Sequence, residues 1–176
     1  MIAVLALVTL AADAQFSKAT LQATGLTCAM CSNAINKALL KVSFVESVRS
    51  DIKNSSFNIV FKTGADIDID ALRHAVEEAG FSVGSLKLTG DLTGITVASG
   101  KHLQLGKENF HFLDVKDQVL QGQTTLTVVD KDFVTARQYK KIAGSASMEC
   151  VKSGKAAACC EQAGIPAGTR VYHVTI

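Results

Sequence analysis

The chain of 176 residues contains no tryptophan and one proline, and its formal net charge at pH 7 is only +2. Neither half carries a marked excess of Lys and Arg, so the charge pattern excludes nucleic acid as an expected partner. No apolar run after residue 10 reaches the length of about 20 residues that a membrane-spanning helix needs. The length and the 48% hydrophobic content suit one or two compact domains.

The first residues predict export. Residues 1–10 are almost wholly apolar, and Ala12-Asp13-Ala14 follows as a small-x-small cleavage pattern. We therefore expect a signal peptide over residues 1–14 and a mature, periplasmic or secreted protein that begins near Gln15. No Lys or Arg precedes the apolar run, and a buried N-terminal strand is the alternative. Membrane association is expected only if the signal stays uncleaved.

Two thiols stand three residues apart where a helical pattern begins. Cys28 and Cys31 can converge on one soft metal ion, because the first turn of a helix brings such positions together. Unpaired N–H groups and the partial positive charge at a helix N-terminus favour thiolate, the form that binds metal. The pair is therefore a candidate metal site.

Residues 25–31, Gly-Leu-Thr-Cys-Ala-Met-Cys, resemble the Gly-Met-Thr-Cys-x-x-Cys signature of the heavy-metal-associated domain. That family includes copper chaperones, N-terminal modules of copper-transporting P-type ATPases and periplasmic mercury-binding proteins. The resemblance extends over about residues 18–88, with Leu26 where Met is usual. It implies a ferredoxin-like βαββαβ fold, with Cys28 and Cys31 as ligands of Cu(I), Zn(II) or Hg(II).

The hydrophobic periodicity of this region agrees with the implied fold. Apolar residues recur at helical spacing after Cys31 and again after Asp68, which is a plausible N-cap. The second helical pattern ends at Gly80, a residue that favours helix termination. Alternating or β-rich segments predict strands over residues 19–25, 45–52, 57–61 and 81–88.

The second half of the sequence has a different pattern, with short β-rich segments separated by glycines. Gly94, Gly100 and Gly106 punctuate short β-rich segments, a helix is predicted over residues 136–142, and residues 171–176 alternate as a last strand. These features predict a small barrel of oligonucleotide/oligosaccharide-binding type. The overall prediction is an α+β chain with a heavy-metal-associated domain over residues 15–88. A β-rich domain over residues 89–176 follows, and it contains an excursion over residues 144–168.

Four sulfur-containing residues lie close together in the sequence of that excursion. Cys150, Cys159 and Cys160 lie close to Met148 in a chain that has only five cysteines. In an oxidising compartment, Cys150 could pair with Cys159 or Cys160 as a disulfide. A second soft-metal site with Met148 as a further ligand is the other functional interpretation, and simple apolar packing is the third.

The four histidines are interpreted as structural or surface residues. His74 falls on the second predicted helix, where it should face solvent. His102, His111 and His173 lie in predicted strands, with no Cys or carboxylate at ligand spacing. The sequence therefore does not predict them as metal ligands.

These observations predict an exported, non-enzymatic carrier or scavenger of a soft metal. Cu(I) is the preferred cargo, with Hg(II) or Zn(II) as alternatives, and a membrane metal transporter or another metalloprotein is the expected partner. A thiol–disulfide oxidoreductase is a competing hypothesis, since Cys-x-x-Cys is also a redox motif. The chain lacks tryptophan, and its only proline, Pro166, is remote in sequence from the pair. An adaptor whose second half binds a protein or glycan is the third hypothesis.

Overall fold

The computed structural model describes residues 15–26, 28–145 and 148–176. The predicted signal peptide lies outside the described residues. The first half contains the elements β1 (Gln15–Thr24), α1 (Ala29–Leu40), β2 (Val45–Asp51), β3 (Ser56–Phe61), α2 (Ile69–Glu78) and β4 (Ser82–Asp91). This βαββαβ order is the one that the sequence predicted.

The second half is built from short strands followed by helices and a last strand. Its elements are β5 (Thr96–Val97), β6 (His102–Leu105), β7 (Glu108–Phe112), β8 (Gln118–Val119), β9 (Gln123–Val128), α3 (Ala136–Ser145), α4 (Glu149–Ser153), α5 (Ala158–Glu161) and β10 (Val171–Thr175). The predicted excursion over residues 144–168 holds α4 and α5. Among the helices in the described part of the chain, none is long and apolar enough to cross a membrane.

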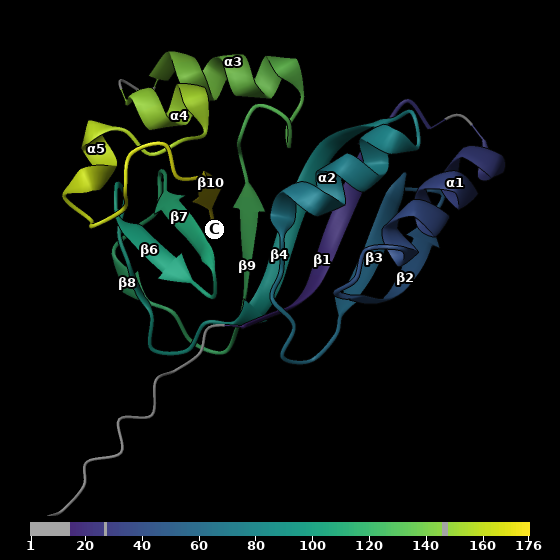
Figure 1. Cartoon of the computed structure of the whole chain (residues 1–176), viewed down its shortest axis with the longest axis horizontal. Coiled ribbons are helices and arrows are strands. Elements are labelled where there is room, and N and C mark those ends of the chain that lie inside the picture. Colours follow the sequence, from purple (N-terminus) through teal and green to yellow (C-terminus); the bar gives the residue numbers. More distant parts are fainter. Residues whose placement is uncertain (1–14, 27, 146–147) are drawn as a thin grey trace, which may run out of the picture.

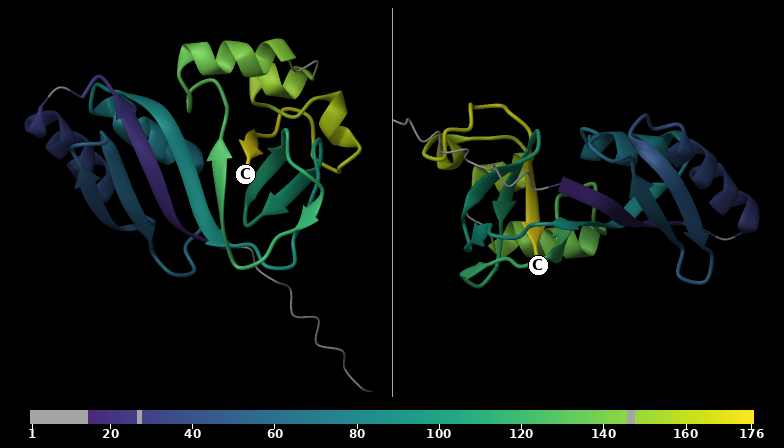
Figure 2. Two further views of the ribbon diagram at one scale, coloured as in Figure 1. Left: turned by 180° about the vertical axis from the view of Figure 1, so that it is seen from behind. Right: turned by 90° about the horizontal axis from the view of Figure 1, so that it is seen from below.

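One sheet runs through both halves. Its eight strands have the order β2-β3-β1-β4-β9-β10-β7-β6, and β5 pairs with β8 in a separate ribbon. Helices α1 and α2 lie on one face of the first half, whereas α3, α4 and α5 belong to the other end (Figures 1 and 2). The second half thus extends the first sheet, and the predicted small barrel is not confirmed.

Strand β4 joins the two halves. It pairs antiparallel with β1 on one side and with β9 on the other, so that Leu88 lies opposite both Ala19 and Leu126. The predicted domain boundary at residues 88/89 falls inside this strand. Apolar side chains from both halves consequently form one continuous core, in which Phe16 of β1 meets Phe110 of β7 with ring centroids 5.6 Å apart.

Local sequence signals explain where the two helices of the first half begin and end. Asp68 caps α2, because its Oδ1 accepts a hydrogen bond from the Ala71 N–H at 3.0 Å. Gly80 ends the helix with φ +86°, a conformation that glycine adopts without strain. In α1, the apolar residues at helical spacing after Cys31 include Ile35 and Leu39, which are buried, and Ala34, which is exposed.

Candidate functional site

Cys28 and Cys31 meet at the start of α1. Cys28 is the N-cap residue in an extended conformation, and Cys31 lies in the first helical turn. Their Sγ atoms are 2.7 Å apart, and the Cys31 N–H donates to the Cys28 Sγ at 3.4 Å. Cys28 is exposed, Cys31 is half-buried, and Leu26 packs against the main core below them. The two thiols therefore converge at an accessible point on the surface.

The local electrostatics favour the thiolate form of Cys28. A hydrogen bond from the Cys31 thiol, followed by the one from the Cys31 backbone N–H, lowers the pKa of Cys28. The first turn of α1 contains no acidic residue whose negative charge would oppose ionisation. Cys28 therefore loses its proton more readily than an ordinary thiol when a cation binds.

This arrangement provides two sulfur ligands. Because a metal–sulfur bond is about 2.3 Å long, an ion between the sulfurs would hold them further apart than 2.7 Å, and the exposed Cys28 side chain has room to rotate. Within the described residues, no His, Asp or Glu side chain joins the pair to make a set of three. Met30, between the cysteines, is 83% exposed and faces solvent. The site suits a soft ion that accepts two thiolates.

Comparison with known proteins identifies this half of the chain. Residues 20–82 match the heavy-metal-associated domain family. The match confirms the resemblance to this family that the sequence predicted, and Cys28 and Cys31 lie within the matched residues.

Individual relatives cover the same region. A probable copper-transporting ATPase of Arabidopsis thaliana is 29% identical over 69 residues, which are 39% of this chain and 7% of that protein. The chain thus spans only a small part of that curated relative. Among solved structures, the CopZ metallochaperone has 22% identity and a TM-score of 0.35, covering 38% of this chain and 98% of its own. The N-terminal domain of a potential copper-translocating P-type ATPase from Bacillus subtilis has 28% identity and a TM-score of 0.36, covering 43% and 90%.

The three cysteines of the second half also come together. The Sγ atom of Cys150 is 3.1 Å from that of Cys159, which is 3.6 Å from that of Cys160. All three are free thiols in the structure, and Cys150 and Cys160 are fully buried. Met148 is half-buried and packs against the same small apolar cluster.

The sequence places no Cys or carboxylate at ligand spacing from His102, His111 or His173, but the fold brings such groups beside them. Strand pairing places His111 opposite His102 of β6 and opposite His173 of β10. The rings of His102 and His111 stack with centroids 4.0 Å apart, and the Cys150 Sγ is 3.6 Å from the His111 Nδ1. The three histidines therefore form a row beside the cysteines. His74 is exposed, as predicted.

Two charged residues that the sequence did not single out support this row. Asp130 is 5% exposed, and its Oδ1 lies 2.6 Å from the His173 Nδ1. The Arg170 Nη2 is 3.2 Å from the Asp130 Oδ2, and the Arg170 Nε is 3.0 Å from the Asp70 Oδ2 on α2.

Burial lowers the pKa of His111 to about 3, helped by His102 and His173, so its imidazole is neutral near pH 7.

A signal for the row was present in the sequence. The predicted turn at Gly106, closed by Lys107, pairs Leu105 with Glu108 and so brings His102 opposite His111. In β7, moreover, His111 stands between Phe110 and Phe112, and period-2 alternation sends it to the face opposite these core residues.

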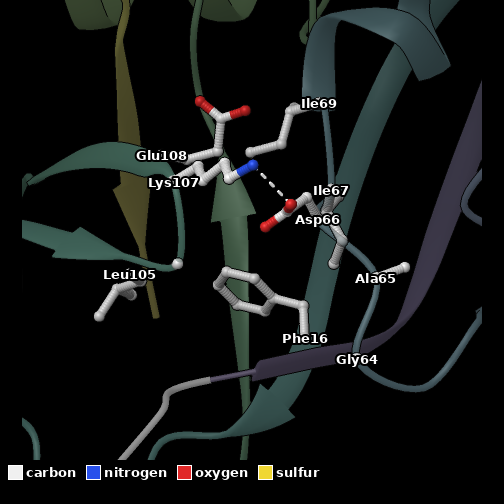
Figure 3. A pocket seen from close by; sticks show the side chains of 10 residues that line it. Phe16, Gly64, Ala65, Asp66, Ile67, Ile69, Leu105, Lys107 and Glu108 are labelled. Atoms are coloured by element: carbon white, nitrogen blue, oxygen red, sulfur yellow. Dashed lines mark ion pairs between the residues drawn. The ribbon is translucent and has the colours of Figure 1, made fainter.

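A cavity of about 360 Å³ lies where the two halves meet. Figure 3 shows the Phe16 ring and the Glu108 carboxylate at its wall, beside the ion pair between Lys107 and Asp66. Burial, with added repulsion from Asp68 and Asp70, raises the pKa of Glu108 to about 7. Glu108 is thus a half-buried titratable group in the wall of this cavity.

Proposed function

We propose that the chain binds Cu(I) through Cys28 and Cys31 and passes it to a partner. The observation that carries this proposal is the convergence of two thiols at an exposed helix N-terminus, with no third ligand beside them in the described residues. The family match and the sequence likeness to a probable copper-transporting ATPase support copper as the cargo. Zn(II) prefers four ligands, which this pair does not supply.

Exposure of the site gives the transfer its mechanism. Each cysteine loses a proton as it binds, so the ion gains two thiolates without a change in oxidation state. A partner thiolate then attacks the accessible ion, one bond to Cys28 or Cys31 breaks, and that cysteine recovers a proton. The ion moves without being released, and a membrane metal transporter or another metalloprotein with a similar Cys pair is the proposed recipient.

An anaerobic titration of Cu(I) against a chromophoric chelator tests the site. We expect the reduced full chain to lose one tight equivalent in the Cys28→Ser/Cys31→Ser variant, whereas Met30→Leu, a matched change of the exposed sulfur between them, keeps it. Serine is a good N-cap residue, so the variant should retain α1. Full retention of every equivalent in the double variant would contradict the assignment.

Two further assays decide between this function and its competitors. A preference for Hg(II) over Cu(I) at the same cysteines in a competition titration would favour mercury as the cargo. Insulin reduction that depends on Cys28 would favour a thiol–disulfide oxidoreductase. The proposed export is checked by mass spectrometry of the mature protein, which should begin near Gln15 and be recovered outside the cytoplasm.

A further inference from the structure

The cysteines and histidines of the second half form a buried cluster of six nitrogen and sulfur ligand residues. We propose that this cluster, defined as Cys150, Cys159, Cys160, His102, His111 and His173, is a second metal site for a thiophilic d¹⁰ ion, Zn(II) or Cu(I). It lies on elements other than those that carry Cys28 and Cys31, so the proposal stands independently of the proposed function.

Ligand spacing is the first argument. The ligand atoms of His102, Cys150 and Cys160 lie within 4.8 Å of one another, and so do those of His111, Cys150 and His173. Both sets contain Cys150, which makes this thiol the common centre. Zn–S bonds of about 2.3 Å and Zn–N bonds of about 2.0 Å fit donor atoms at such separations.

Burial is the second argument. Cys150, Cys160, His111 and His173 are each 0% exposed. In the part of the chain that the structure describes, Nε2 of His102, of His111 and of His173 is buried and has no hydrogen-bond partner. Buried polar atoms are almost always paired, because leaving one unpaired forfeits its hydration. Three unpaired imidazole nitrogens beside three thiols point to a missing partner for these atoms.

The surroundings of His173 supply the third argument. An ionised carboxylate only accepts hydrogen bonds, so Asp130 fixes the proton of His173 on Nδ1. The lone pair of His173 is then on Nε2, the unpaired atom. A carboxylate behind a histidine is the usual way in which proteins orient a metal-binding imidazole. Arg170 holds Asp130 in turn through its Nη2.

The other interpretations leave part of this arrangement unexplained. A disulfide between Cys150 and Cys159 would use two of the thiols and leave the three imidazole nitrogens unpaired. Simple packing of small apolar thiols does the same. Soft or borderline ions bind thiolate and imidazole together, whereas hard cations such as Mg²⁺ and Ca²⁺ require oxygen ligands. A closed site shielded from water is typical of a metal that stays bound.

The test uses the full chain carrying Cys28→Ser and Cys31→Ser, so that the first site contributes nothing. After anaerobic reduction, Zn(II), Cu(I) and the spectroscopic probe Co(II) are titrated separately. We expect one or more tightly bound equivalents, and with Co(II) the intense d–d and thiolate charge-transfer bands of tetrahedral sulfur coordination. Competition between Zn(II) and Cu(I) then identifies the preferred ion.

Substitutions in the same background locate the site. Cys150→Ser should abolish the Co(II) charge-transfer bands, and His102→Gln, on the edge strand β6, should weaken binding by at least about tenfold. Asp130→Asn should weaken it about 10–100-fold, as expected for a residue that orients a ligand. His74→Gln, which removes an exposed imidazole from α2, should change nothing. Circular dichroism of each metal-free variant establishes that it is folded.

Three results would overturn the proposal. The first is a folded, fully reduced Cys28→Ser/Cys31→Ser protein that binds neither Zn(II) nor Cu(I) more tightly than micromolar. The second is binding that survives unchanged in both Cys150→Ser and His102→Gln. The third is a Cys150–Cys159 or Cys150–Cys160 disulfide in the purified protein whose reduction creates no metal affinity.

Discussion

At the scale of single residues, Arg170 links the two halves of the molecule. Its guanidinium contacts Asp70 on α2 and Asp130 beside the buried cluster, and it lies over the Tyr172 ring, 4.1 Å from the centroid. Its Nη1 also donates to the backbone carbonyls of Gly154 and Val171, at 2.9 Å each. One cation thereby satisfies acceptors from four different segments.

We predict that Arg170→Gln lowers the free energy of unfolding by about 2–4 kcal/mol, because it leaves Asp130 buried without its cation. The matched control is Lys107→Gln. Lys107 pairs with Asp66 at the surface, where both side chains are mostly exposed, and its loss should cost about 0–1 kcal/mol. Urea denaturation at pH 7 measures both values. Equal effects for the two substitutions would contradict the role assigned to Arg170.

Glu108 makes the free energy of unfolding decrease as pH rises, whereas an ion-paired carboxylate makes it increase. Its pKa is about 7 in the folded chain, above the ordinary value of 4.5, so between these values the native state holds the proton that the unfolded state has lost. Stability therefore falls as pH rises from about 4.5 to about 7 and then levels off. We predict that Glu108→Gln removes this slope and adds roughly 1–2 kcal/mol at pH 8. Denaturation curves of both proteins across that pH range check the prediction, and parallel pH profiles would refute it.

The lowered pKa of Cys28 has a kinetic readout. Thiolate is the reactive form, so Cys28 should be alkylated by iodoacetamide at a pH where an ordinary exposed thiol is still largely protonated. In the metal-free Cys31→Ala variant, the hydrogen bond from the Cys31 thiol is lost with no other side-chain donor in its place, and the pH midpoint of alkylation should rise. Mass spectrometry of the labelled peptide follows the reaction. An unchanged midpoint would show that the backbone N–H alone sets the pKa.

At the scale of elements, α2 depends on its cap. Asp68 Oδ1 accepts from the Ala71 N–H, and the negative charge lies at the positive end of the helix. We predict that Asp68→Ala lowers the free energy of unfolding by about 0.5–2 kcal/mol, whereas Asp68→Ser recovers most of the loss. Thermal unfolding followed by circular dichroism measures this. A serine variant as unstable as the alanine variant would mean that the cap hydrogen bond contributes little.

The elements also show which features a sequence can predict. Those of the heavy-metal-associated domain follow from short-range signals, such as the apolar spacing of Ile35 and Leu39, the cap at Asp68 and the stop at Gly80. The Cys28 and Cys31 pair needs only one helical turn to converge. The histidine row required strand pairing, and His111 meets His173 only because β7 and β10, far apart in sequence, lie parallel in one register. Local patterns do not specify that pairing, and they did not predict that β4 would carry the sheet into the second half.

At the scale of the whole molecule, the shared sheet should make the two halves unfold together. Leu126 of β9 is 0% exposed and lies opposite Leu88 of β4, where the halves join. We predict that Leu126→Ala lowers the free energy of unfolding by about 2–5 kcal/mol in a single transition. Hydrogen exchange should then accelerate in β1 and β10 alike. Loss of protection confined to the second half would show that the halves unfold separately.

The shared sheet also affects how a metal ion could pass between the two thiol clusters. Cys28 and Cys31 begin α1 at the end of the sheet where β2 is the edge strand, whereas the cysteine–histidine cluster lies at the end where β6 is the edge (Figure 1). The shared sheet places these clusters at its two ends, so we expect that an ion bound at the first is not handed directly to the second. Exchange between them would require an encounter of two molecules, and its initial rate should grow with the square of the protein concentration. Stopped-flow mixing at several dilutions would reveal this second-order behaviour.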